Sequence, residues 1–308
     1  ALRQLTAILR NLKNLPPRER KKQGKAANEL RHILEVEVEK KRSQLKKGAH
    51  EIRLKSERID ITQPGKKPWK GSLHPLTLIQ RDIEQIFISL GFEVVEGPEV
   101  ETEWYNFDAL NIPVNHPARD MWDTFWLKNG ALLRTHTSPV QIHYMETHQP
   151  PLRIIVPGRT FRYEATDASH DIQFYQLEGL MVGRHVTLAN FKHVIGVFLQ
   201  KIFSQNVTIR LRPSYFPFVE PGVEVDMSCM HCSSKGCSVC KQTGWLEMAG
   251  AGMVHPNVFK SAGWRSGPQN RWQGFAFGFG IDRIAMMKYK IPDIRLFYSG
   301  DIRFLKQF

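Results

Sequence analysis

Cysteine is scarce in this chain, and long hydrophobic runs are absent from it. Only four of its 308 residues are cysteines, all between positions 229 and 240, which excludes a small scaffold held together by many disulfides. No apolar run approaches the roughly 20 residues of a membrane-spanning helix, and no internal repeat is present. Because 42% of the residues are hydrophobic, the composition predicts a globular protein with one large domain and an appendage.

Acidic residues are too few in the N-terminal segment to balance its basic ones. Residues 1–60 hold 17 Lys and Arg against 8 Asp and Glu, whereas the other 248 residues hold 26 against 22. Positive charge concentrated in this way is typical of an arm that binds nucleic acid, although a solvated helix that only aids solubility would have the same composition. The first fifteen residues lack a continuous apolar core, so we expect no secretory signal peptide and a cytoplasmic protein.

The N-terminal segment has helical spacing. Apolar residues predict one helix over 2–14 and a longer one from about 18 to 59, joined at Pro16-Pro17. Two helices with this corner form an antiparallel hairpin, which we assign to residues 1–61. Its apolar face is too narrow to form the core of an independent domain, so the hairpin should project from the body or pack against a partner. Residues 62–73 have the composition of a linker.

Residues 74–308 are predicted to form a single α+β domain. A helical period covers 76–90, Gly91 suits the position after its end, and a strand is expected over 92–100. Consecutive strands with few intervening helices predict a mostly antiparallel sheet flanked by helices. The other strands are expected at 131–134, 153–156, 160–164, 176–182 and 208–212, and a further helix at 188–204.

Two strings carry an arginine next to glycine or aromatic residues. In the C-terminal string, Gly278 and Gly280 leave room beside a strand for a bulky flat ligand, and Arg283 follows as a phosphate clamp. In the earlier string, a two-residue period would place Arg162 and Glu164 on one face of a strand. An arginine that binds a phosphate, next to a carboxylate that accepts hydrogen bonds from an amino group, suits a nucleotide.

Further polar residues form a candidate receptor for an ammonium group. Gln176 and Glu178 share a face with Phe174, which offers a surface on which a base can stack. His136 and Ser138 stand where a strand enters a helix. A single histidine in such a place is more often a core or capping residue than a ligand-binding one.

Phe216 and Phe218 flank a proline and would lie on one face of the chain. Paired aromatics are core residues more often than pocket residues. The neighbouring prolines, however, disfavour a central strand and favour a stiff wall. Such a wall could select an aromatic side chain through edge-to-face contacts.

The two arginine strings, in this order, resemble motifs 2 and 3 of class II aminoacyl-tRNA synthetases. Longer strings resemble the alpha subunits of bacterial-type phenylalanyl-tRNA synthetases over essentially the whole chain. These strings are Phe-Asp-Ala-Leu-Asn-Ile-Pro (107–113), Asp-Thr-Phe-Trp (123–126), Arg-Thr-His-Thr-Ser-Pro (134–139), Phe-Pro-Phe-Val-Glu-Pro (216–221), Gly-Met-Val-His-Pro (252–256) and the C-terminal Phe-Leu-Lys-Gln-Phe.

The resemblance implies a nucleotide site. Arg162 is expected to grip the α-phosphate of ATP and Arg283 the outer phosphates, which makes them the expected catalytic residues. Glu164 is expected to contact the adenine amino group, with Phe174 stacked on the ring and His170 near the phosphates. Asp282 stands where many members of the family have Glu, which preserves the acidic character.

The resemblance also implies a phenylalanine site and a metal ligand. The residues expected to hold the amino and carboxyl groups of L-phenylalanine are His136, Ser138, Gln176 and Glu178. Those expected around its ring are Phe216, Phe218, Ala276 and Gly278. Glu220 matches a Mg²⁺ ligand that the family describes as shared with the beta subunit.

For partners, the resemblance implies the beta subunit in an α2β2 heterotetramer, together with tRNA(Phe), ATP and L-phenylalanine, and no membrane. The expected reaction is ligation of phenylalanine to tRNA(Phe) through a phenylalanyl-adenylate. An inactive synthetase-like paralogue that binds tRNA or regulates is the alternative, and loss of Arg162, Arg283 or Glu178 would indicate it; all three are present.

The cysteines form two C-x-x-C pairs within an insert at 229–240. Cys229, Cys232, Cys237 and Cys240 have spacing suited to a structural Zn²⁺, and Gly236 eases the turn between the pairs. The four-residue spacer is short for a zinc ribbon, so reduced thiols, an iron–sulfur cluster, disulfides or His231 as a substitute ligand stay open. Family members often have a non-cysteine loop here, which implies an optional stabiliser outside catalysis.

Overall fold

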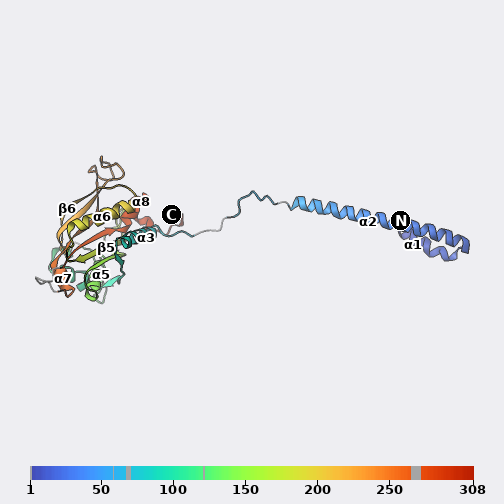
Figure 1. Ribbon diagram of the computed structural model, residues 1–308. Helices are drawn as coiled ribbons and strands as arrows, with labels where there is room; N and C mark the ends of the chain where they lie inside the picture. The colour runs from blue at the N-terminus through green and yellow to red at the C-terminus, as the bar shows by residue number, and fades with distance from the viewer. Residues whose placement is uncertain (1, 58, 67–70, 121, 265–271) are drawn as a thin grey trace. The chain divides into compact units, whose positions relative to one another are not determined.

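The computed structural model describes residues 2–57, 59–66, 71–120, 122–264 and 272–308. The chain divides into two compact units, Ala1–Lys70 and Gly71–Phe308 (Figure 1). Among the described residues, no helix combines the length and the apolar character needed to span a membrane.

The first unit is a helical hairpin. Helix α1 (Leu2–Asn11) and a 3-10 turn (η1, Leu12–Asn14) pack against the beginning of α2 (Pro17–Ser56). Proline fits the first turn of α2 because the backbone N–H that it lacks would have no partner there. Leu5 of α1 and Ala27 of α2 are buried, whereas Leu45 is 65% exposed. The predicted hairpin is therefore confirmed, and the later turns of α2 present apolar side chains to solvent.

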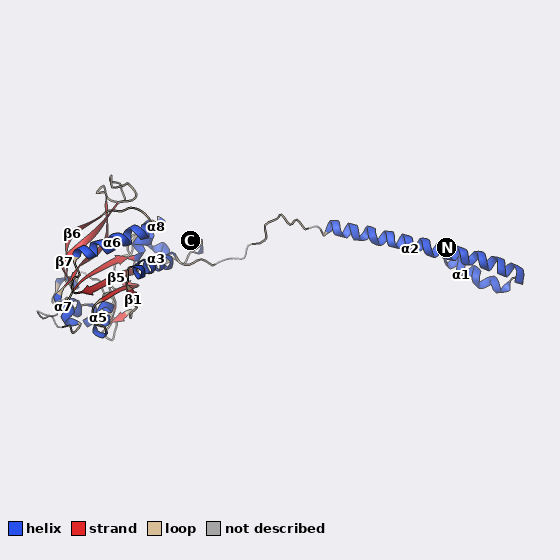
Figure 2. Ribbon diagram, in the orientation of Figure 1, coloured by secondary structure: helices blue, strands red, loops and turns tan. Residues whose placement is uncertain are grey.

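The second unit is built on a seven-stranded sheet (Figure 2). Strand β1 pairs with β4 in parallel and every other pair is antiparallel, which confirms the predicted fold class. In spatial order the strands are β1 (Glu93–Val94), β4 (Leu152–Phe161), β5 (Gln173–Gly183), β9 (Gln273–Gly280), β8 (Trp245–Val254), β7 (Val219–Ser228) and β6 (Ile209–Phe216). A small second sheet pairs β2 (Val100–Glu101) with β3 (Leu132–Leu133).

One face of the large sheet carries helices α3 (Pro75–Ser89), α6 (Leu188–Phe203) and α8 (Ile281–Tyr289). Ile79 and Ile83 of α3 are fully buried, and Phe87 stacks on Phe277 of β9 with ring centroids 5.6 Å apart. Gly91 ends α3 with a φ of +81°, as the sequence predicts. Near the C-terminus, η4 (Ile294–Phe297) and α9 (Ile302–Leu305) complete this core.

The opposite face carries a second core and the pocket described below. Because side chains alternate along a strand, β9 directs Phe275, Phe277 and Phe279 into the first core and Ala276 into the second. The covering elements are α4 (Glu103–Asn106), η2 (Asp108–Leu110), η3 (Pro117–Arg119), α5 (Pro139–Thr147) and α7 (Pro256–Ser261).

Two strand expectations are wrong in their limits. The strands expected at 153–156 and 160–164 are one strand, β4, which ends at Phe161, so Arg162 and Glu164 lie beyond it. The strand expected over 92–100 is interrupted: only β1 and the first residue of β2 are strands, because Gly97-Pro98 breaks the extended pairing. Pro213 lies in β6, an edge strand, where its missing N–H is tolerated.

Candidate active site

A pocket of about 600 Å³ opens on the face of the sheet opposite α3 and α6. Strands β5, β8 and β9 form its floor, and the β6–β7 hairpin and the segment from Leu110 to Gln141 form its walls. The pocket brings together nine of the residues expected in the site: His136, Ser138, Arg162, Gln176, Glu178, Phe216, Phe218, Ala276 and Gly278.

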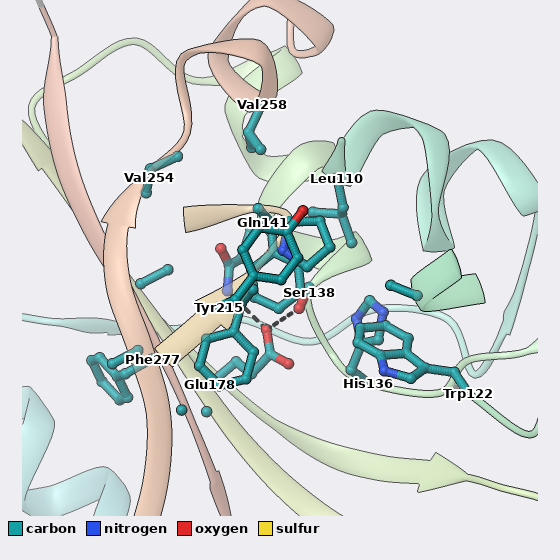
Figure 3. Close-up of a pocket in the computed structure, with 18 of the residues that line it drawn as sticks. Leu110, Trp122, His136, Ser138, Gln141, Glu178, Tyr215, Val254, Val258 and Phe277 are labelled. Carbon is teal, nitrogen blue, oxygen red and sulfur yellow. Dashed lines mark hydrogen bonds between the residues drawn. The ribbon is translucent and has the colours of Figure 1, made fainter. Parts of the chain in front are cut away.

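Glu178 is the centre of a hydrogen-bonded group of polar side chains in the pocket (Figure 3). Its side chain comes from the middle of β5 and is buried. Ser138 Oγ and Gln141 Nε2 both donate to Oε2 of Glu178, the latter at 3.0 Å. Burial raises the pKa of Glu178 to about 7, against the opposing effects of the Ser138 hydrogen bond and the Arg162 charge. A carboxylate that is buried away from water and hydrogen-bonded on one side can pair strongly with the ammonium group of a ligand.

His136 contributes unsatisfied polar atoms to the same pocket. It is 2% exposed, and neither ring nitrogen has a hydrogen-bond partner of good geometry among the described residues. Burial, and then the charge of Arg162, hold its pKa well below the usual 6.5, so the ring is neutral. Gln176 Oε1 is likewise unpaired within the described part of the chain. Buried polar atoms that lack partners and line a cavity are those that a bound ligand would satisfy.

Arg162 follows the end of β4 and is held by its surroundings. Its Nε donates to Thr135 O at 3.2 Å, and its guanidinium lies 4.9 Å from the centroid of the Phe174 ring. One terminal nitrogen of Arg162 lies 3.8 Å from Glu164 Oε1. Although the strand ends before Arg162, the structure still brings Arg162, Glu164 and Phe174 together.

Other expected residues lie outside the pocket lining. Arg283 is exposed in the first turn of α8 and makes no ion pair or hydrogen bond within the residues described. His170 is exposed, with its ring 3.0 Å from Asp167 Oδ1. Glu220 is exposed on β7. Glu164 and Phe174 contact Arg162 but do not line the pocket.

The pocket lining also includes the expected pair of phenylalanines. The rings of Phe216 and Phe218 are nearly parallel, at 22°, with centroids 6.1 Å apart, and they project from the two sides of the β6–β7 turn. The backbone of Gly250 lies close to the Phe216 ring, since a Cβ on Gly250 would come within 2.8 Å of that ring. A Cβ on Gly278 would lie 3.0 Å from Gln176 Nε2.

The sequence did not indicate several pocket residues. Gln141 could have been found, because it lies three residues after Ser138 on the same helical face. Trp122 packs edge-on against His136, with ring centroids 4.3 Å apart, and no sequence pattern indicates this contact. The residues missed are Leu110, His116, Pro117, Ala118, Trp122, Gln141, Tyr215, Pro217, Gly250, Ala251, Val254, Val258 and Phe277.

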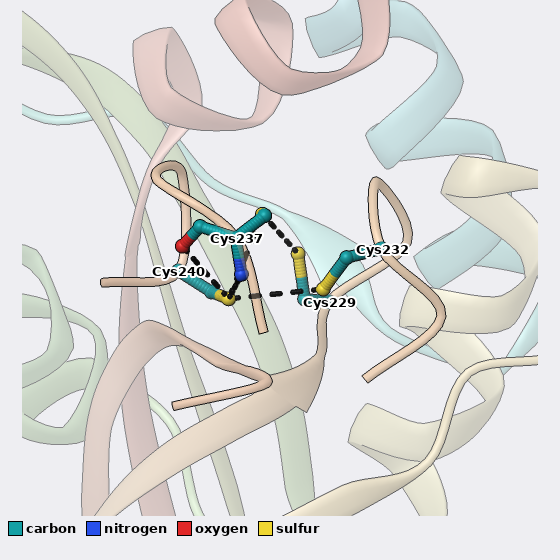
Figure 4. Close-up of side chains that lie close together, drawn as sticks. All are labelled: Cys229, Cys232, Cys237 and Cys240. Atoms are coloured by element: carbon teal, nitrogen blue, oxygen red, sulfur yellow. Dashed lines mark hydrogen bonds between the residues drawn. The ribbon is translucent and has the colours of Figure 1, made fainter. Parts of the chain in front are cut away.

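The four cysteines come together in the connection between the end of β7 and the start of β8 (Figure 4). Their sulfur atoms all lie within 4.8 Å of one another, with three pairs at 3.6, 3.8 and 3.9 Å, and none forms a disulfide. Backbone N–H groups of Gly236 and Gly244 point at the sulfurs of Cys232 and Cys240. This arrangement is compatible with a bound metal ion.

Comparison with known proteins agrees with these features. Residues 58–308 match the family of tRNA synthetase class II core domains (F), and residues 4–54 match the aminoacyl tRNA synthetase class II N-terminal domain. The chain is 52% identical over 305 residues to the phenylalanine–tRNA ligase alpha subunit of Leptospira biflexa serovar Patoc, which covers 99% of this chain and 89% of the relative. It is 50% identical over 306 residues to the protein of that name from Bacillus cytotoxicus, covering 99% of this chain and 88% of the relative.

A solved structure shares the fold. Pyrrolysyl-tRNA synthetase from Desulfitobacterium hafniense aligns with a TM-score of 0.54 and 16% identity, covering 89% of this chain and 83% of that one. Identity this low shows a common fold and carries nothing about the substrate.

Proposed function

The chain belongs to the family of phenylalanine–tRNA ligase alpha subunits and has a class II synthetase core. We propose that it ligates L-phenylalanine to tRNA(Phe) at the expense of ATP. The observation that carries the proposal is one pocket lined by two unlike sets of side chains: Glu178, hydrogen-bonded to Ser138 and Gln141, and the aromatic pair Phe216 and Phe218.

Each of the two sets of side chains suits one part of phenylalanine. The ammonium group would pair with Glu178 and Gln176, while the carboxylate would accept a hydrogen bond from His136, whose neutral ring has an N–H to donate. The benzyl group would lie against Phe216 and Phe218, with Ala276 and Gly278 on the floor. Aromatic pairs in such geometry gain about 0.5–1.5 kcal/mol beyond the burial of area.

Adenylate formation would use the two arginines. The carboxylate of phenylalanine attacks the α-phosphorus of ATP in line and pyrophosphate leaves, so the reaction needs positioning and charge stabilisation and no covalent enzyme intermediate. Arg162 would hold the α-phosphate and Arg283, which is exposed without a protein partner in the described chain, the outer phosphates. Phe174 and Glu164 would receive the adenine, and His170 would lie near the phosphates.

Mg²⁺ would accompany ATP and neutralise phosphate charge. Glu220 is the expected protein ligand, and its exposed carboxylate on β7 is of the oxygen type that Mg²⁺ prefers. A hydroxyl of the terminal ribose of tRNA, the 2′-OH in this family, would then take the phenylalanyl group from the adenylate.

The cysteine cluster would hold a structural Zn²⁺. A Zn–S bond of about 2.3 Å places tetrahedral sulfur atoms about 3.8 Å apart, close to the 3.6, 3.8 and 3.9 Å between the cysteine sulfurs. Four thiolates leave no open position on the ion, so it would stabilise the insert without taking part in catalysis.

A beta subunit would be the partner, since the relatives are named as alpha subunits. The assembly would be an α2β2 heterotetramer, and the protein would act in the cytoplasm. The helical unit, whose net positive charge is concentrated in residues 1–60, would bind tRNA as an arm. The domains would therefore be the arm at 1–61, the linker at 62–73 and the catalytic body at 74–308.

The decisive experiment is ATP–pyrophosphate exchange with each of the twenty amino acids, using the chain alone and co-produced with its beta subunit. We expect exchange with phenylalanine in the co-produced sample. Exchange with another amino acid, or none from folded protein that binds ATP, would overturn the proposal.

A further inference from the structure

Asp282, the residue before Arg283, is buried and fully engaged. It is 2% exposed, and its two oxygens have different partners. Oδ2 accepts a hydrogen bond from the backbone N–H of Tyr175 at 2.6 Å, and Oδ1 accepts one from the hydroxyl of Tyr298 at 2.5 Å. A buried carboxyl with both oxygens satisfied by groups on different elements fixes those elements relative to one another.

The first of these bonds joins the start of α8 to β5. The last register pair between β5 and β9 is Gln176 with Gly280, so the N–H of Tyr175 lies one residue beyond the ladder. Asp282 lies in the first turn of α8, next to Arg283, and its side chain accepts a hydrogen bond from that N–H group. The residue before Tyr175 is Phe174, whose ring lies against Arg162. Asp282 therefore bonds to β5 one residue away from the phenylalanine that packs on Arg162, and it directly precedes Arg283 in α8.

The second bond brings in a segment that lies outside both arginine motifs. Tyr298 follows η4 and is half-buried beside Phe297. At the start of the same segment, the N–H of Ile294 donates to Ala168 O at 3.0 Å, in the loop that contains His170. Burial raises the pKa of the Tyr298 phenol, so its hydroxyl keeps the proton that it donates. The segment therefore contacts two places where the ATP phosphates are expected.

We propose that Tyr298 is a positioning residue for ATP: through Asp282 it holds the first turn of α8, and with it Arg283, in register with β5. The inference rests on the proposed function, because it assumes that Arg283 grips phosphate. Tyr298 is thereby assigned a role in the binding of ATP. Phenylalanine binding should not depend on it, since Tyr298 does not line the pocket that contains Glu178.

The test is Tyr298→Phe in the chain co-produced with the beta subunit, because this change removes only the hydroxyl. In ATP–pyrophosphate exchange we expect the KM for ATP to rise about tenfold, as for a hydrogen bond to a charged group, with the KM for phenylalanine within about twofold of wild type. The matched control is Tyr289→Phe in α8, whose hydroxyl makes no hydrogen bond among the described residues and whose ring packs on Phe308. It should leave both constants unchanged.

A double-mutant cycle keeps the inference falsifiable if either single change also affects folding. Asp282→Asn alone should raise the KM for ATP, and adding Tyr298→Phe to it should raise that constant little further, because the two groups act as a unit. An unchanged KM for ATP, equal rises in both KM values, or full additivity would overturn the positioning role. If wild-type enzyme shows no phenylalanine-dependent exchange, the proposed function fails instead, and the two failures are distinguishable.

Discussion

Ser138 and Glu178 are hydrogen-bonded to each other in the pocket lining and join the N-cap of α5 to the middle of β5. The bond favours the charged form of Glu178, whereas burial favours the neutral form and is the larger effect, so the pKa of Glu178 is raised to about 7. This balance places the ionisation of the expected ammonium receptor in the range where enzymes work.

Phenylalanine binding should therefore depend on pH. Below pH 7 Glu178 takes up a proton and can no longer pair with an ammonium group, so the KM for phenylalanine should rise as pH falls, by up to about tenfold per unit. Exchange assays between about pH 6 and pH 8.5 measure how the KM for phenylalanine depends on pH. In Glu178→Gln this KM should be high and should not vary with pH. A constant KM in the wild type would contradict the role of Glu178.

The same ionisation affects stability. Because the pKa of Glu178 is raised above its ordinary 4.5, this group contributes most to the free energy of unfolding at low pH, and the contribution is lost as pH rises through about 7. Phenylalanine supplies the missing positive charge. It should therefore raise the Tm more at pH 8 than at pH 6, which differential scanning fluorimetry can measure.

Arg283→Ala should abolish adenylate formation. Removing a donor that stabilises developing phosphate charge typically costs about 100- to 1,000-fold in kcat. The Tm should not change, because Arg283 is exposed and has no partner in the described chain. Arg303→Ala is the control, since that side chain is 90% exposed and, among the described residues, its ion pair is with Asp301, two residues earlier. Pyrophosphate exchange at the wild-type rate in Arg283→Ala would refute the phosphate role.

Ala276→Gly should enlarge the pocket and admit para-substituted phenylalanines. Ala276 lines the pocket from β9, so losing its methyl group adds space beside the ligand ring. Ala249→Gly on β8 is the control, because Ala249 lies in the opposite core. Both changes cost about 0.5–1 kcal/mol of strand stability, but only Ala276→Gly should raise kcat/KM for p-chlorophenylalanine. Identical selectivity in the two variants would place the pocket floor elsewhere.

Metal removal should lower stability more than activity. We expect one zinc per chain by elemental analysis, and a lower Tm after chelation or in Cys240→Ser. Ser238→Ala, a change at an exposed position in the same turn, should keep the metal and the Tm. Bound iron with visible absorption would indicate an iron–sulfur cluster instead of zinc. If protein purified without chelator contains no metal, the four cysteines are reduced thiols and the zinc proposal is wrong.

Removal of residues 1–60 should weaken tRNA charging far more than adenylate formation. The segment holds nine of the thirteen net positive charges and no residue of the pocket. Comparing aminoacylation with pyrophosphate exchange in the truncated enzyme measures the difference. An equal loss of both activities would show that the hairpin is needed for folding or assembly and not for tRNA.

Features that depend only on residues close together in the chain could be predicted from the sequence. Periodicity placed α3 and its buried Ile79, Ile83 and Phe87, and Gly91 marked its end. Alternation in β5 correctly put Gln176 and Glu178 on one face, because side-chain direction in a strand has a fixed period. The C-x-x-C spacing also indicated the cysteine cluster, since both pairs lie within one short insert.

Contacts between segments far apart in the chain could not be predicted, because they depend on how the whole chain folds. The protonation of Glu178 depends on its burial and on Ser138, and Trp122 reaches His136 from a loop with no repeating pattern. Likewise, Asp282 joins Tyr175 and Tyr298 across three elements. Local sequence sets which way a side chain points, whereas solvent exclusion and long-range contacts set its pKa and its partners.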